Sequence, residues 1–170
     1  MNYLSYNIFA ALKTSIRGPS SILRMEDLKI SPLQKGHKIK IECMGGSSNF
    51  WIVCNPNEIL LYENELAKLL RRVEMFSKTP LDSSCLVKGQ IVAALWSKDE
   101  KMYRALITDI NLNLGKVNVR FIDYGNQSIE PFKNLFVLPK LYGSKIPALA
   151  KLIDLDGVPI VKKSHHLENL

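Results

Sequence analysis

The sequence has few of the residues that build disulfide-linked, metal-binding or membrane-spanning proteins. Its 170 residues include three cysteines and three histidines. Cys43, Cys54 and Cys85 are odd in number, form no Cys-x-x-Cys pair and follow no secretory signal, so we expect reduced thiols. The histidines have no partners at zinc-binding spacing, so we expect no metal site. The apolar runs, such as residues 91–96, are far shorter than the ~18 residues of a membrane span, and no membrane partner is expected.

Recognisable catalytic motifs are also missing. The sequence contains no glycine-rich phosphate loop, no Ser/His/Asp order and no Cys–His arrangement that stands out. Metal-dependent cleavage of a phosphodiester needs clustered carboxylates and arginines, whereas the carboxylates here are scattered. We therefore expect a protein that is not an enzyme and has no cofactor.

What is present is the composition of an ordinary soluble globular protein. Hydrophobic residues make up 46% of the chain and charged residues 23%, and the length suits one domain or a module held by parts of a second. The net charge is +7, and residues 1–40 alone contain seven basic and two acidic side chains. A basic surface gives weak support for contact with RNA, although it more often serves solubility.

The first half of the chain predicts helix, strands and a second helix. Residues 3–16 fit an amphipathic helix, followed from Gly18-Pro19 by a linker. Residues 38–43 alternate polar and apolar side chains, which predicts a half-buried strand, and residues 49–54 predict a second strand. A helix near residues 58–72 is predicted from an apolar stripe with steps of three and four residues: Ile59, Tyr62, Leu66, Leu69 and Val73.

Residues 88–139 contain a compact run of short strands separated by turns. Strands are expected at 90–95, 102–110, 116–122 and 127–130, followed by a short helical turn at 132–138. Short strands at this spacing predict a small, strongly bent barrel. One more strand is expected at 148–155.

Aromatic residues gather at the expected strand ends and turns of this barrel. Trp96 ends the first strand and Tyr103 begins the second, while Phe121 and Tyr124 lie late in the third strand and in its turn. In sequential antiparallel strands these positions can meet at one mouth of the barrel. Aromatic rings around a small opening attract a cation, and the amide oxygen of Asn126 can accept a guanidinium N–H. This pattern predicts a pocket for an arginine-derived cation, and methylation makes that cation less hydrated.

Two observations weigh against this interpretation. Phe121 alternates with Val117 and Val119, so it could simply face the barrel core. Residues 86–140 contain eight basic and five acidic side chains, a balance of +3 that opposes an arginine-rich ligand at long range. A local acidic rim could offset this charge, and the candidates are Asp99, Glu100 and Asp109.

The segment Phe-Ile-Asp-Tyr-Gly-Asn at 121–126, after the Tyr-Arg-Ala strand at 103–105, resembles the Tudor domain family. The likeness is to the extended Tudor domains of germline granule proteins and covers about residues 36–157. In that family a strand pair and a helix precede the barrel and further strands follow it. The resemblance implies a mainly β fold with helices, in which a small bent Tudor barrel joins a partial staphylococcal-nuclease-like (OB-type) β-subdomain.

The implied organisation has four parts. They are an N-terminal helix and linker at 1–35, two strands and a helix of the nuclease-like subdomain at 36–86, the Tudor barrel at 87–140, and a returning nuclease-like strand with a polar tail at 141–170. Extended Tudor domains continue further beyond their returning strand than this sequence does after Asp156. This leaves open whether the chain is a fragment of a multi-Tudor protein.

The resemblance also implies roles for individual residues. Five positions match the family's cage and polar clamp for symmetric dimethylarginine: Trp96, Tyr103, Phe121, Tyr124 and Asn126. Arg104 and Asp123 match a structural ion pair, and Gly125 supplies a positive φ in the turn.

The family's usual ligands are Arg-Gly or Arg-Ala repeats in the tails of Piwi-type Argonaute proteins. The implied function is a non-catalytic reader and scaffold in piRNA-guided transposon silencing, located in the cytoplasmic, perinuclear germline granule (nuage). Two alternatives stay open. One is a methylation-independent peptide-docking or self-associating scaffold, and the other is a basic RNA-binding module.

Overall fold

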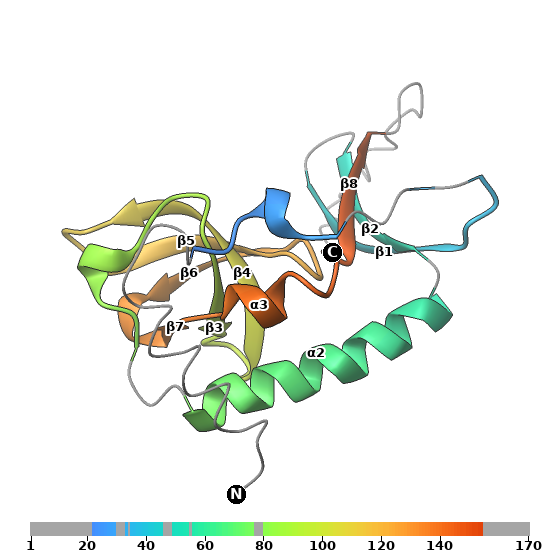
Figure 1. Ribbon diagram of the computed structural model, residues 1–170. Helices are drawn as coiled ribbons and strands as arrows, with labels where there is room; N and C mark the ends of the chain where they lie inside the picture. The colour runs from blue at the N-terminus through green and yellow to red at the C-terminus, as the bar shows by residue number, and fades with distance from the viewer. Residues whose placement is uncertain are drawn as a thin grey trace, which may run out of the picture.

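Two antiparallel sheets and one long helix make up most of the computed structural model (Figure 1). The structure describes residues 22–29, 33, 35–45, 49–54, 56–76 and 80–154. The helix expected at residues 3–16 lies outside these residues.

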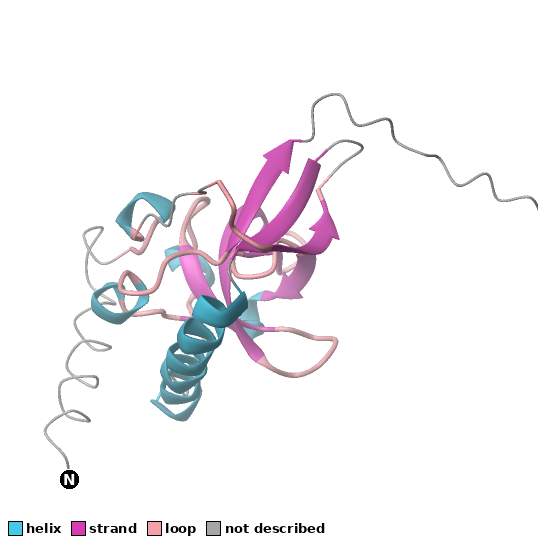
Figure 2. Cartoon of the chain, turned by 90° about the vertical axis from the view of Figure 1, so that its right-hand side faces the viewer, coloured by secondary structure: helices cyan, strands magenta, loops and turns pink. Residues whose placement is uncertain are grey.

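The first sheet combines two early strands with one from the end of the described chain. Its order is β1 (Ile39–Met44), β2 (Asn49–Cys54) and β8 (Ala150–Asp154). β2 has the predicted bounds, and β8 is the returning strand, paired with β2 from Val53–Ala150 to Asn49–Asp154. Figure 2 views the molecule from the side of this sheet, with the long helix running toward the viewer.

The exposure of β1 differs from the prediction of a half-buried strand. Ile39 and Ile41 are 48% and 57% exposed. Ile52, which pairs with Ile41, is fully buried in the central strand β2. β1 lies at an edge of the sheet, so its side chains have a neighbouring strand on one side only.

The second sheet is the bent barrel, with strand order β6-β5-β4-β3-β7. Its four longer strands lie close to their predicted places and pair in sequence, as expected. They are β3 (Ile91–Leu95), β4 (Met102–Asn111), β5 (Lys116–Phe121) and β6 (Gln127–Pro131). A register shift between Ile107 and Asp109 interrupts the pairing of β4 with β5, and such a bulge bends the strand.

The helical turn predicted at residues 132–138 is wrong for its second half. Only η4 (Phe132–Asn134) is helical, and β7 (Leu135–Phe136) pairs with β3 at the edge of the barrel. Pairing with a strand some 40 residues earlier holds these two residues extended, and the Leu135 carbonyl accepts from the Leu81 N–H at 2.7 Å. This long-range partner is invisible to local periodicity.

Helix α2 (Pro56–Phe76) is longer at both ends than the predicted helix, and its buried face differs. Leu66, Leu70 and Val73 are buried, whereas Tyr62, a member of the predicted stripe, is 36% exposed. The second half of α2 lies against the barrel and its first half extends toward the first sheet (Figure 1). Among the α2 side chains that the structure describes, the buried ones lie from Leu66 onward. Within the described part of the chain, no helix is both long and apolar enough to cross a membrane.

Two cores hold these elements together. One fills the barrel, and its buried members include Val92, Ala105, Val119 and Leu135. The other lies between α2 and the barrel and includes Leu23 and Leu28, which the sequence analysis placed in a linker. The Ile91 N–H donates to the carbonyl of Leu23 at 2.7 Å, so this early segment is fastened to the start of β3. The described part of the chain also contains three short helices: η2 (Met25–Asp27), η3 (Ser83–Cys85) and α3 (Lys140–Gly143).

Candidate functional site

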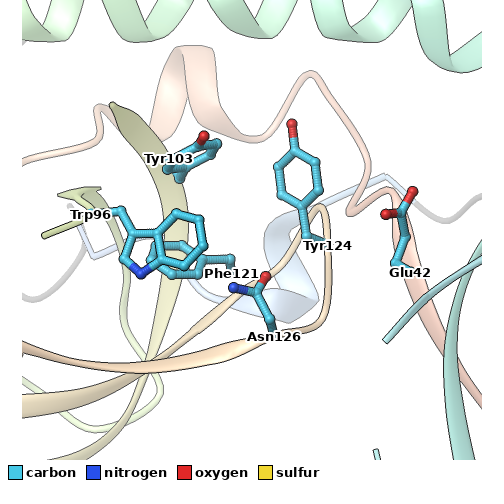
Figure 3. A pocket seen from close by; sticks show the side chains of 6 residues that line it. All are labelled: Glu42, Trp96, Tyr103, Phe121, Tyr124 and Asn126. Carbon is cyan, nitrogen blue, oxygen red and sulfur yellow. The ribbon is translucent and has the colours of Figure 1, made fainter. Parts of the chain in front are cut away.

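A cavity of about 220 Å³ opens between the end of the barrel and the first sheet. Four aromatic side chains, one amide and one carboxylate line it, as Figure 3 shows: Trp96, Tyr103, Phe121, Tyr124, Asn126 and Glu42. The structure therefore brings together all five residues that the sequence analysis proposed for a binding pocket. Glu42 was not among them.

The four rings meet at steep angles. Tyr103 is central, with ring centroids 5.9 Å from Trp96, 5.4 Å from Phe121 and 5.5 Å from Tyr124. The planes of Tyr103 and Tyr124 are 89° apart, and those of Tyr103 and Trp96 are 79° apart. Edge-to-face packing of this kind is favourable for aromatic pairs and lets rings stand as separate walls around the cavity.

Small residues on neighbouring strands make room for these rings. Tyr103 at the start of β4 pairs with Ala94 of β3, and Phe121 at the end of β5 pairs with Ala105 of β4. Both alanines are fully buried. Phe121 is 1% exposed and packs in the same core as Val119, so it belongs to the barrel core and to the wall of the cavity at once.

A buried polar cluster holds the strand end that carries Trp96. The carboxylate of Glu130, fully buried, accepts hydrogen bonds from the backbone N–H and the hydroxyl of Ser97. Asn134 donates to the same carboxylate and to the carbonyl of Leu95, each at 3.1 Å. Leu95 and Ser97, on either side of Trp96, are thereby hydrogen-bonded to β6 and η4. These hydrogen bonds join separate elements, so no local pattern in the sequence predicts them.

Arg104 and Asp123 form a bidentate ion pair deep in the structure. The Asp123 carboxylate accepts from Arg104 Nε at 3.0 Å and from Arg104 Nη2 at 2.5 Å. The guanidinium also donates to the carbonyls of Ile146 and Pro147, and the Leu149 N–H donates to Asp123. The pair thus joins β4 and the turn after β5 to the segment that leads into β8.

Gly125 lies in the turn between two pocket residues. Its φ is 87°, a conformation that glycine adopts without strain. A Cβ at this position would also collide with the Trp51 indole from the first sheet. The positive φ agrees with the expectation from the sequence, whereas no local pattern in the sequence indicates the contact with Trp51.

Carboxylates lie close to the two tyrosines of the pocket. The Tyr103 hydroxyl donates to Asp99 at 2.6 Å, and burial together with this carboxylate raises the pKa of Tyr103 well above its usual range. Burial likewise raises the pKa of Tyr124, and carboxylates including Glu63 and Glu42 add to the effect. Asp99 therefore contributes to the expected acidic rim through its hydrogen bond with Tyr103, although none of the three expected rim residues, Asp99, Glu100 and Asp109, lines the cavity itself.

No metal centre is evident in the part of the chain that the structure describes. Among these residues, His, Cys, Asp and Glu side chains nowhere gather in a group of three or more that could hold an ion. The functional chemistry of the cavity is that of aromatic faces, one amide and a nearby negative charge.

A bent five-stranded barrel with an aromatic pocket, fused to a second small sheet, has the architecture of a binding module. The family comparison agrees, because the Tudor domain model matches residues 31–157. The chain belongs to the Tudor domain family, as the resemblance implied. Tudor domains are binding modules, and no catalytic family is indicated.

Comparison with individual proteins shows which members of the family the chain is similar to. It is 27% identical over 139 residues to human Tudor domain-containing protein 1, and the match covers 81% of this chain and 12% of that protein. The chain thus spans about a tenth of the length of this relative. The crystal structure of Tudor in complex with dimethylated (me2s) Aubergine is 27% identical with a TM-score of 0.58, covering 71% of this chain and 68% of that one.

The fold agrees with that of extended Tudor domains. The human TDRD1 extended Tudor domain, solved with a symmetrically dimethylated peptide, has a TM-score of 0.63 at 20% identity and covers 81% of this chain and 67% of that one. The prediction of a mainly β Tudor barrel joined to a nuclease-like β-subdomain is confirmed.

Proposed function

We propose that this chain reads arginine methylation, with symmetric dimethylarginine bound in the aromatic pocket. The observation that carries the proposal is the meeting of four aromatic rings and one amide in a single cavity (Figure 3). Trp96, Tyr103, Phe121 and Tyr124 would enclose the guanidinium, and the Asn126 amide oxygen would accept one of its N–H groups.

The size and electronic character of the cavity support this ligand. About 220 Å³ is below the range of typical small-molecule sites, and it suits the head of one side chain. The Trp96 ring already attracts a cation on this protein, since Lys98 Nζ lies 5.6 Å from its centroid. A methylated guanidinium keeps its charge, has fewer N–H groups to satisfy and adds apolar surface, so it is better suited than free arginine to aromatic walls.

The partner we propose is the arginine-methylated tail of a Piwi-type Argonaute protein. The complex of Tudor with Aubergine and that of mouse TDRD1 with a dimethylarginine MILI peptide support this choice. In this role the chain would be a scaffold of piRNA-guided silencing in the perinuclear germline granule. We propose the division at residues 36–86, 87–140 and 141–170 as the organisation that serves it.

The test is a calorimetric titration with one Arg-Gly/Arg-Ala peptide in unmodified, asymmetrically dimethylated and symmetrically dimethylated forms. We expect the symmetric form to bind about tenfold more tightly than the unmodified peptide, in the micromolar range. Tyr124→Ala should remove this preference because it opens one wall of the cavity. Tyr62→Ala is the matched control, since Tyr62 is exposed on α2 and does not line the pocket.

The other outcomes decide between the alternatives. Equal affinity for all three forms would overturn methylation reading in favour of a methylation-independent peptide dock. Failure of every form to bind would overturn the peptide-reader proposal. In that case RNA becomes the next ligand to titrate, and a steep loss of affinity with salt would identify it.

A further inference from the structure

Glu42 enters the pocket because of an irregularity in β1. Ile41 pairs with Ile52 and Cys43 with Trp51, so β1 has one more residue than β2 between these two pairs. Glu42 is the extra residue of this β-bulge. A bulge redirects side chains, and bulges are frequent beside functional sites.

The bulge places neighbouring residues on the barrel-facing side of β1. Cys43 donates its thiol hydrogen to the carbonyl of Tyr124, with a sulfur–oxygen distance of 3.6 Å. Glu42 lines the pocket with only 18% of its side chain exposed. A carboxylate with this little exposure needs a cationic or hydrogen-bonding partner.

In the free protein that partner is Lys40. The two side chains form an ion pair at 2.8 Å, and 65% of the Lys40 side chain is exposed. An exposed lysine can return to water at little cost, because exposed pairs contribute about 0–1 kcal/mol. Another cation can therefore replace Lys40 without leaving Glu42 unpaired.

The position of Glu42 decides which group of the ligand it can meet. In Figure 3 the Tyr124 ring lies between Glu42 and the rings of Trp96 and Tyr103. A guanidinium enclosed by the rings is thus on the other side of Tyr124 from the carboxylate. The carboxylates of Glu42 and Glu63 both contribute to the raised pKa of Lys40 and of Tyr124, whereas Arg120 acts in the opposite sense on the pKa of Cys43.

We propose that Glu42 is a specificity-determining residue that binds a second basic side chain of the ligand peptide. The preferred ligand is then a peptide with a methylarginine in the aromatic pocket and an unmodified arginine or lysine nearby in its sequence. This assignment rests on the proposed methylarginine site. It also accounts for how a barrel with an excess of basic residues accepts a basic peptide: the nuclease-like sheet supplies the carboxylate that the barrel lacks at this place.

The test compares two peptides at physiological salt. One carries a single symmetric dimethylarginine with neutral flanks, and the other adds one arginine, placed in turn at successive positions on either side. At the preferred position the added arginine should raise the affinity of the wild type about fivefold. Glu42→Gln should abolish this gain, and Lys40→Gln should enlarge it by removing the competing cation.

Glu65 and Lys68 are the matched control pair. They form an ion pair at 2.9 Å on the exposed surface of α2 and do not line the pocket. Glu65→Gln and Lys68→Gln should leave the gain at its wild-type value. Circular dichroism and a thermal unfolding midpoint equal to those of the wild type show that Glu42→Gln is folded, and the gain is measured for each variant relative to its own affinity for the neutral-flank peptide.

Two results would overturn the assignment. If the neutral-flank peptide binds but Glu42→Gln keeps the full gain from the second arginine, Glu42 has no such role and the methylarginine site stands. If the neutral-flank peptide fails to bind the wild type, the methylarginine site itself is wrong and this assignment is lost with it.

Discussion

The indole of Trp51 lies against Gly125, and this contact joins the first sheet to the pocket turn of the barrel. The guanidinium of Arg120 lies over the same indole in a cation–π contact, with its Cζ 5.0 Å from the ring centroid. Gly125 is flanked in sequence by Tyr124 and Asn126, which line the pocket. The first sheet therefore supports the turn that carries two of the six pocket residues.

Replacing Gly125 by alanine should destabilise the protein by about 3 kcal/mol. The alanine would have to adopt a φ near 87°, and its Cβ would collide with the Trp51 indole. Urea unfolding followed by circular dichroism measures the loss.

Gly36→Ala is the matched control for this change. Gly36 has a φ of 88°, but among the described residues beyond its chain neighbours no atom would lie within 4 Å of an added Cβ. Its replacement should therefore cost only the backbone strain, about 1 kcal/mol. Equal losses in the two variants would show that Trp51 yields freely and does not constrain the turn.

Breaking the buried ion pair should be among the most damaging single changes. Arg104→Met leaves the Asp123 carboxylate, 3% exposed, without its cation, and the expected loss is about 3–5 kcal/mol. Differential scanning calorimetry together with urea unfolding would measure it.

Lys140→Met provides the comparison. Lys140 pairs with Asp27 at 2.8 Å, and 41% and 20% of the two side chains are exposed. This pair is partly open to solvent, so its removal should cost no more than about 1 kcal/mol. If Arg104→Met and Lys140→Met lower the free energy of unfolding by similar amounts, burial does not make the Arg104–Asp123 pair more important for stability than the partly exposed pair.

The tyrosines of the pocket should make stability fall at alkaline pH. Burial raises the pKa of Tyr103 and of Tyr124 in the folded protein above the unfolded value of about 10. The folded state then holds these protons more tightly than the unfolded state. Stability is fully present below pH ~10 and is lost as the pH rises from there toward the raised values.

Urea unfolding between pH 8 and 11 measures this decline. Tyr103→Phe should reduce it because one of the two shifted groups is gone. Asp99→Asn should reduce it less, since Asp99 is the second cause of the Tyr103 shift after burial. If stability falls as steeply in Tyr103→Phe as in the wild type, the raised pKa of Tyr103 is not a cause of the alkaline loss of stability.

Much of the fold was readable from the sequence because it depends on local patterns. The strand at 49–54 follows from its aromatic and β-branched residues, and the first four barrel strands follow from apolar or alternating segments separated by turns. The motif at 121–126 identified the family. The aromatic residues of the pocket could be named for a related reason. They lie at ends and turns of sequential antiparallel strands, where the chain order itself brings them together.

Contacts between distant elements were not readable in this way. The sequence alone determined the barrel, its family and the five residues that meet in its pocket. Only the tertiary structure decided that Glu42 joins them, that Trp51 covers Gly125 and that Leu23 is a core residue. The physical reason is that a strand's pattern specifies two faces but not what each will meet, and a single bulge changes which side chains face the barrel.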